Sequence, residues 1–169
     1  GRWISVIVTT WNGIDLGGVY RRGRIEDILV QMILKESKER HGLDREMCIL
    51  ESLEVAKSIS DDGIKSKALL NISKVLIEEG REEELLEVAR SISDDGIKSE
   101  TLLNISKVLI EEGREEEGEK ILEESLEVAK SISDDRKKSE ALSNISKVLI
   151  EVGREEESLE VARSISDGR

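Results

Sequence analysis

A fourteen-residue phrase that occurs three times constrains this chain more than any other feature. The phrase reads NISKVLIEEGREEE at residues 71–84 and 104–117, and NISKVLIEVGREEE at residues 144–157. The starting points, 71, 104 and 144, are therefore 33 and 40 residues apart. Repeats of this length are typical of paired helices that stack side by side, because one pair cannot bury both of its faces alone. The sequence predicts a helical repeat array.

Apolar residues follow a helical period through the first part of each repeat. At 100° per residue, one arc of about 140° holds six apolar residues of the first copy, namely Ile64, Ala68, Leu69, Ile72, Val75 and Leu76. Polar residues occupy the opposite side, namely Lys67, Asn71, Lys74 and Glu78. Leu70 and Ile77 lie between, seven residues apart, and form a narrower apolar stripe. We therefore expect a helix over residues 64–79 with a core face and a solvent face.

Start and stop signals bracket this helix. Ser60, Asp61 and Asp62 offer N-cap oxygens and negative charge, so the helix is expected to begin at the aspartates. Arg136 stands in the third copy where the others have glycine, which predicts ordinary backbone there. Glycine closes each first helix, at positions 80, 113 and 153, and is expected in the left-handed conformation. A second helix should follow over residues 82–92.

The longer 40-residue step comes from seven extra residues, GEKILEE, at 118–124. Seven residues make two helical turns with only about 20° of drift, so Ile121 and Leu122 should extend the apolar face of Val128 and Ala129. We expect the second helix of that hairpin to be longer by roughly 10 Å. Hairpins are then predicted at about 25–60, 61–93, 94–133 and 134–166.

The third copy, EALSNISKVLIEVGREEESLEVARSIS at residues 140–166, resembles the tetratricopeptide repeat. The similarity lies in its alanine, leucine, asparagine, small Ser146, large Leu149 and the glycine before the second helix. The repeat departs from that family in two ways. Leu76 and Ala89 of the first copy stand where the family usually has aromatic residues, and no proline closes the unit. The resemblance implies an all-α, right-handed superhelix over residues 25–169.

In that family the first helices line a concave groove that holds a peptide. Carried onto this chain, the resemblance implies a polar ladder of Asn71, Lys74, Asn104, Lys107, Asn144 and Lys147. Apolar residues would flank it, namely Leu70, Ile77, Leu103, Ile110 and Ile150, with Ser143 at the remaining position. An asparagine amide can pair with a peptide backbone, and a lysine can hold a carboxylate. The alternative is that these residues form an ordinary solvated face, with Leu70 and Ile77 packed against a neighbouring hairpin.

The excess of acidic residues limits the kinds of partner that we expect. The net charge is −12, and residues from 51 onward carry 18 basic against 31 acidic side chains. Nucleic-acid binding relies on lysine and arginine at phosphates, so we expect no nucleic-acid partner and favour a protein or peptide, particularly a basic one. An RNA-binding helical repeat remains the alternative. High Glu, Lys and Arg with a single glutamine, Gln31, also resembles heat-adapted composition.

No motif for catalysis accompanies the carboxylates, which occur as EEGREEE blocks typical of solvated helix ends. One histidine, His41, and one cysteine, Cys48, cannot form a zinc cluster, and Cys48 is expected to fill a helix face. We therefore expect no enzyme activity, no metal and no cofactor. With no disulfide framework and no apolar run of about 18 residues, a cytoplasmic location away from membranes is expected.

The first 24 residues differ from the rest. ISVIVTTW is β-branched and aromatic and precedes Asn12-Gly13, which predicts extended structure or a β-hairpin. The nine residues ISVIVTTWN also resemble the opening strand of GT-A glycosyltransferases, which implies a second alternative, a repeat region attached to such a domain. That family's acidic metal-binding pair has no equivalent here, because Asp61-Asp62 and Asp94-Asp95 are expected as helix caps.

The chain begins without an initiator methionine or a secretory signal, and we interpret it as a piece of a longer protein. It stops at SISDGR, where a further first helix would begin. The last hairpin is therefore expected to leave an apolar face uncovered. Further repeats, or another molecule such as a second copy in a homo-oligomer, would cover that face.

Overall fold

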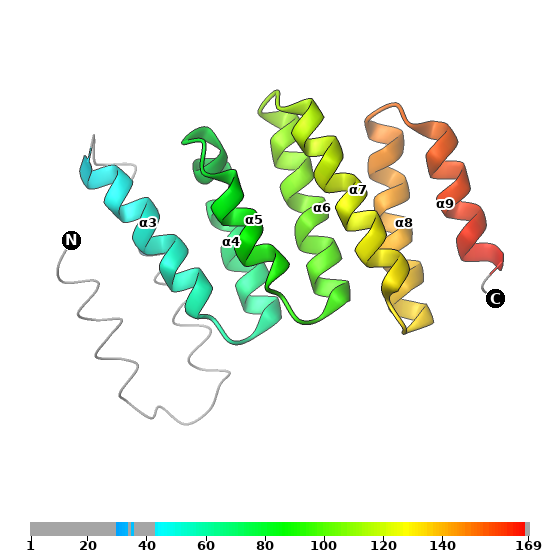
Figure 1. The fold of residues 1–169 in the computed structure, drawn as a ribbon, viewed down its shortest axis with the longest axis horizontal. Coiled ribbons are helices and arrows are strands. Elements are labelled where there is room, and N and C mark those ends of the chain that lie inside the picture. Colours follow the sequence, from blue (N-terminus) through cyan, green and yellow to red (C-terminus); the bar gives the residue numbers. More distant parts are fainter. Residues whose placement is uncertain (1–29, 34, 36–42, 168–169) are drawn as a thin grey trace. The chain divides into compact units, whose positions relative to one another are not determined.

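The computed structural model describes residues 30–33, 35 and 43–167, and each regular element in these residues is an α-helix (Figure 1). The all-α class is thus confirmed for the described part of the chain. The extended segment predicted for residues 1–24 lies outside the described residues, and so does His41. Among the described residues, no helix has the length and apolar character that crossing a membrane requires.

The helices divide into two compact units, with the boundary between Ser91 and Ile92. The first unit contains α3 (Leu43–Ser58), α4 (Asp62–Glu78) and α5 (Glu82–Arg90), and residues 30–33 and 35 are also helical. The second unit contains α6 (Asp95–Glu111), α7 (Glu115–Ser131), α8 (Asp135–Glu151) and α9 (Glu155–Asp167). Each unit is built from antiparallel helical hairpins joined by short turns.

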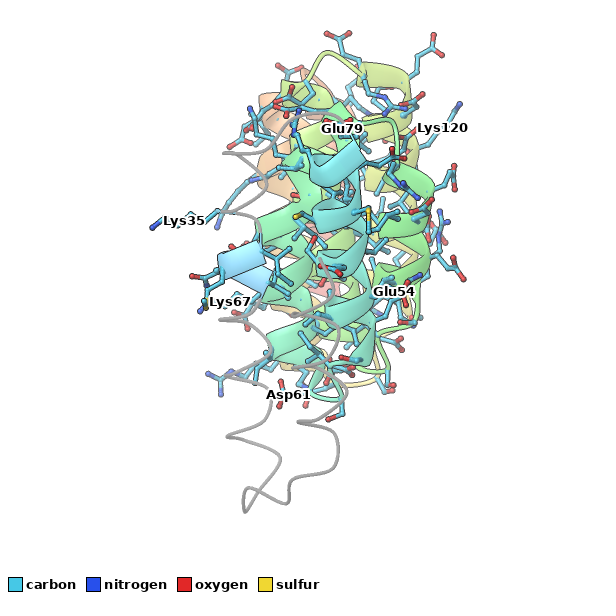
Figure 2. All side chains as sticks on the ribbon, turned by 90° about the vertical axis from the view of Figure 1, so that its left-hand side faces the viewer. Lys35, Glu54, Asp61, Lys67, Glu79 and Lys120 are labelled. Atoms are coloured by element: carbon cyan, nitrogen blue, oxygen red, sulfur yellow. The ribbon has the colours of Figure 1, made fainter. Side chains whose placement is uncertain are left out.

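In the first unit, α3, α4 and α5 pack against one another. The predicted core face of α4 is largely confirmed, because Ala68, Leu69, Ile72 and Leu76 are fully buried. Ile64 and Val75, at the edges of the predicted arc, are only half-buried. Polar side chains such as Lys35 and Lys67 point away from the helices (Figure 2). Cys48 is buried on α3, in agreement with its interpretation as a small apolar filler.

In the second unit, α6 packs against α7 and α8, α7 packs against α8, and α8 packs against α9. Their shared core is made of buried aliphatic side chains from all four helices and the α7–α8 turn, namely Leu103, Leu122, Leu126, Ala129, Ile132, Leu142, Ile145, Val148, Leu149 and Val161. Ala141, Val152 and Ile165 pack against it from the edge. The helical period seen in the sequence is therefore the reason these faces meet.

Three aspartates begin the first helices α4, α6 and α8, as predicted. Asp61, Asp94 and Asp134 have extended backbone and accept a hydrogen bond from the N–H three residues on, at 2.9, 3.0 and 2.8 Å. This satisfies one of the donors that a helix start leaves unpaired. Gly63 and Gly96 do not have positive φ angles. The backbone there is therefore ordinary, as predicted from Arg136, which stands at this position in the third copy.

A repeated glycine turn ends each first helix. Gly80, Gly113 and Gly153 have φ values of 71°, 78° and 78°, which confirms the predicted left-handed conformation. In each turn the glycine N–H and the following arginine N–H donate back to carbonyls of the last helical turn, for example Gly80 to Ile77 at 3.1 Å and Arg81 to Leu76 at 2.8 Å. This pattern of two hydrogen bonds is the Schellman motif. It reverses the chain so that the second helix runs back along the first.

The seven extra residues lengthen α7 without disturbing its face. Helix α7 has 17 residues and α5 has nine. Ile121 and Leu122 are buried in line with Ala129, as the heptad predicted. The added two turns therefore contribute apolar area to the core of the second unit.

Candidate functional site

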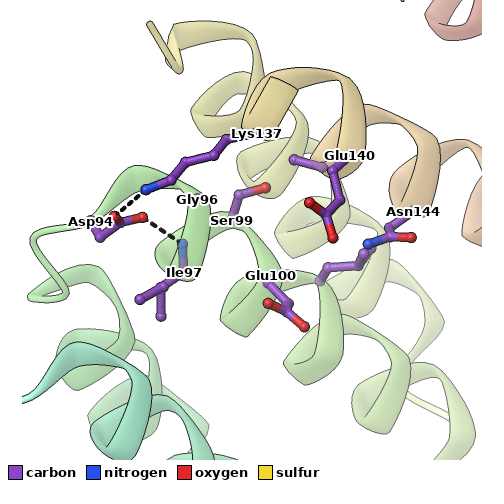
Figure 3. Close-up of a pocket in the computed structure, with 10 residues that line it drawn as sticks. Asp94, Gly96, Ile97, Ser99, Glu100, Lys137, Glu140 and Asn144 are labelled. Carbon is purple, nitrogen blue, oxygen red and sulfur yellow. Dashed lines mark hydrogen bonds and ion pairs between the residues drawn. The ribbon is translucent and has the colours of Figure 1, made fainter. Parts of the chain in front are cut away.

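The strongest candidate for a binding site is a groove between the first helices of the second unit. We call it the α6–α8 groove, and its volume is about 340 Å³. Ten residues line it, namely Asp94, Gly96, Ile97, Ser99, Glu100, Leu103, Lys137, Glu140, Ala141 and Asn144 (Figure 3). The groove lies between two helices that share one buried core, so its walls are positioned by the side chains beneath them.

An ion pair between two of the lining residues lies at one end of the α6–α8 groove (Figure 3). The Lys137 Nζ donates to Asp94 Oδ2 at 2.9 Å, and Asp94 Oδ1 accepts the Ile97 N–H at 3.0 Å. Hydrogen bonds to the Asp94 carboxylate hold its pKa below the ordinary value. The Lys137 ammonium has the larger effect, and the Ile97 N–H has the second largest. Asp94 therefore serves as a helix cap and as a tie between α6 and α8.

A second ion pair joins the same two helices further along. Lys107 Nζ of α6 lies 3.8 Å from Glu151 Oε2 of α8. Both side chains are exposed enough for solvent to weaken the pair. The two contacts join the α6 and α8 segments at different levels along the groove.

The middle of the groove carries two carboxylates over an apolar floor. Glu100 of α6 and Glu140 of α8 are exposed and flank the space between the helices (Figure 3). Leu103 is 4% exposed and forms part of the core beneath, with Ala141 half-buried beside it. Since Asp94 and Lys137 neutralise each other, Glu100 and Glu140 give the groove a negative charge that suits a cationic side chain.

Some polar groups in and beside the groove already form hydrogen bonds within the protein. The Ser99 hydroxyl donates to the Ser125 carbonyl at 3.0 Å, and the Lys147 Nζ donates to Asn144 Oδ1 at a long 3.5 Å. The Asn144 NH₂ group offers two donors in addition to that carbonyl. Asn144 can therefore donate to the backbone carbonyl of a bound peptide.

The predicted ladder residues occupy different surroundings in the two units. On α6 and α8, Leu103 and Asn144 line the groove together, whereas Asn104 is half-buried and not among the lining residues. Ile110 is half-buried close to Gly118 of α7, and Ile150 is 55% exposed. On α4, Asn71 and Lys74 are exposed, Leu70 is half-buried and Ile77 is buried. Because α4 belongs to the first unit, a ladder over all three helices stays a prediction.

The sequence reasoning predicted Leu103 and Asn144 of the ten lining residues and missed all four charged ones, namely Asp94, Glu100, Lys137 and Glu140. Glu100 and Glu140 each lie four residues before a repeated asparagine, so they share its helix face. That spacing was available as a signal. The Asp94–Lys137 contact was harder to foresee, because lysine stands at this position only in the third copy and isoleucine in the others.

A second pocket, in the first unit, is less suited to a charged ligand. It has a volume of about 350 Å³ and is lined by Arg45, Glu46, Ile49, Glu79 and Arg81. Arg45 pairs with Glu79 at 3.0 Å, and Arg81 lies 3.7 Å from Glu46. Its charges thus compensate one another within the protein. Among the described residues, no group of three or more potential metal ligands is present.

Comparisons with known proteins returned no match to a protein-family model, to a curated protein or to a solved structure.

Proposed function

We propose that the chain is a non-catalytic scaffold that binds a basic peptide or protein segment on the face formed by the first helices of its second unit, α6 and α8. The observation that carries the proposal is the α6–α8 groove, in which two exposed carboxylates stand over buried Leu103 beside the amide of Asn144. A lysine or arginine side chain would lie between Glu100 and Glu140, and its aliphatic part would cover the apolar floor. The resemblance of the repeat to tetratricopeptide repeats supports the same face as the binding face.

The acidic groove favours this partner over the RNA alternative. Phosphate groups would meet Glu100 and Glu140 at the centre of the site, and Lys137 already neutralises Asp94. RNA affinity depends chiefly on unpaired lysines and arginines that neutralise phosphates. A basic polypeptide therefore fits the groove better than a nucleic acid does.

Calorimetric titration with an extended peptide of alternating lysine and alanine tests the proposal. The Glu100→Gln/Glu140→Gln double variant should bind about threefold to tenfold more weakly, because each exposed charge pair contributes about 0.2–1 kcal/mol. The matched control is Glu116→Gln/Glu119→Gln, which makes the same charge change at exposed positions of α7. It should leave most of the affinity intact.

The two variants also define what would contradict the groove. If both reduce affinity equally, the peptide responds only to net charge and the groove is not its site. If neither variant binds differently from the unaltered protein, Glu100 and Glu140 do not recognise the peptide and the groove assignment fails. A labelled single-stranded RNA at low salt serves as the competing ligand, and tighter binding of RNA than of peptide would favour the alternative function.

A further inference from the structure

The hairpin of α8 and α9 exposes a largely apolar surface. Leu159 is 58% exposed and Ile150 is 55% exposed, and Ala162 and Ser143 are exposed as well. Leu159 and Ala162 are three residues apart and thus share one face of α9. We call these four residues the outer surface of α8–α9.

The preceding hairpin shows how three of these four positions are covered. By the repeat period, Leu126 corresponds to Leu159, Ala129 to Ala162 and Leu103 to Ser143. Leu126 is 6% exposed, and Leu103, Leu126 and Ala129 lie in one core cluster with apolar residues of α8. A first helix, α8, therefore covers the α6–α7 hairpin at these positions.

Ion pairs also join the α6–α7 hairpin to the α8–α9 hairpin that covers it. Three charged residues of the α6–α7 hairpin each pair with the covering hairpin: Asp94 with Lys137, Lys107 with Glu151, and Glu123 with Arg154. The repeat period places Asp134, Lys147 and Glu156 at the corresponding positions of the α8–α9 hairpin. All three are exposed. The outer surface thus carries the charges, in the same order, that hold a hairpin in the covered position.

We propose that the outer surface of α8–α9 binds a helical hairpin with the residue pattern of α8–α9 itself. That hairpin presents apolar residues to Leu159 and Ile150. It also presents a lysine to Asp134, a glutamate to Lys147 and an arginine to Glu156. A simple apolar helix lacks these three charges and fits less well. The surface is separate from the α6–α8 groove, so the proposal does not depend on the proposed function.

The test joins a second copy of residues 137–169 directly after Arg169, which continues the 33-residue period. Thiol labelling of Leu159→Cys measures whether the added hairpin covers the surface. We expect labelling to slow at least tenfold in the extended chain. Met47→Cys is the control, because Met47 is 52% exposed on α3 and lies outside the proposed contact. Its labelling rate should not change on extension.

Charge reversal provides the second measurement. Lys147→Glu in the extended chain should restore part of the Leu159→Cys labelling rate, because it opposes the glutamate of the added hairpin. Leu159→Cys labelling at the same rate with and without the extension would overturn the proposal. So would labelling of the unextended chain that becomes slower with protein concentration. A second copy would then cover the surface by a different contact, because the matching face of its own α8–α9 hairpin is already packed on α6–α7.

Discussion

At the scale of single residues, small side chains determine how closely the two helices of a hairpin approach. The position seven residues before the turn glycine is serine in each first helix, at Ser73, Ser106 and Ser146. In the last hairpin Ser146 and Ser158 are in mutual contact, with 2.7 Å between their hydroxyl oxygens. In the hairpin of α6 and α7, Gly118 takes the place of Ser158 and lies against the carbonyl of Ser106. Helices α6 and α7 can therefore pack at short range.

Gly118→Ala should destabilise the protein, although alanine is the better helix former. A Cβ at this position would lie 2.5 Å from Ile110 Cγ1 and 2.9 Å from the Ser106 carbonyl oxygen. We expect a loss of about 1–3 kcal/mol, the usual range for overpacking a core. Chemical denaturation measures it. Gly63→Ala is the control, because a Cβ there meets only Asp61 Oδ1 at 3.4 Å, and it should be neutral or stabilising by up to about 1 kcal/mol.

The Asp94 carboxyl should add an acid-sensitive contribution to stability. Its pKa is lowered in the folded state by Lys137 and by the Ile97 N–H. A lowered folded-state pKa means that the contribution is complete above the ordinary carboxyl range, about 3.9, and is lost as pH falls through the folded-state value. In Asp94→Asn the side-chain oxygen can still cap α6 but forms no ion pair. Thermal unfolding of the two proteins should therefore differ at pH 7, and the difference should shrink as the pH falls below the ordinary carboxyl range; a difference that stays constant as the solution is acidified would contradict the assignment.

At the scale of elements, the heptad at 118–124 shifts the contact between two helices by two turns. Ser158 of α9 meets Ser146, but Ser125 of α7 meets Ser99 instead of Ser106, with reciprocal side-chain to carbonyl bonds of 3.0 and 2.8 Å. Ser99 precedes Ser106 by seven residues, the length of the added segment. Insertion of whole heptads thus keeps small residues facing each other.

Deletion of residues 118–124 should leave a folded but less stable protein. Ser125 would then follow Glu117 and meet Ser106, as Ser158 meets Ser146 now. The loss of buried Ile121 and Leu122 should cost roughly 3–6 kcal/mol, at about 1.5–3 kcal/mol per side chain. Circular dichroism should still report a helical protein, with denaturation at lower urea concentration.

A deletion of different length tests whether register is the cause. Removal of residues 118–122 rotates the rest of α7 by about 140°, since five residues make 500° of helix. This change would turn Leu126 and Ala129 away from the core, so unfolding of the second unit is expected. Equal stability of the two deletion variants would show that the heptad register does not matter.

At the scale of the whole molecule, the acidic charge should steer the choice of partner. The net charge is −12, and the α6–α8 groove carries two exposed carboxylates. Charges on a protein surface attract a ligand of opposite sign, and salt screens this attraction.

The affinity for a basic peptide should therefore fall by about tenfold between 20 and 300 mM salt, because the screening length shortens several-fold over that range. Calorimetric titration at several salt concentrations measures the slope. The Glu100→Gln/Glu140→Gln variant should show a shallower slope than the unaltered protein. Salt-independent affinity would mean that apolar contacts alone hold the peptide.

The sequence alone determined the helices and their ends. The 3.6-residue period of Ala68, Leu69, Ile72 and Leu76, the capping aspartates and the left-handed glycines are local features, and local backbone chemistry is enough to interpret them. The repetition of one phrase also made the pairing of helices predictable. These features agree with one another, and so the all-α class followed from them.

Only the tertiary structure decided which residues meet across helices. Three arrangements depend on the rotation and separation of packed helices. Lys137 pairs with Asp94, Glu100 and Glu140 line one groove, and Ile110 lies beside Gly118. A helical period gives the direction of a side chain from its own axis but leaves open which partner stands there. The α6–α8 groove exists because α6 and α8 are held side by side by a core to which both contribute, and no single segment of the sequence contains that information.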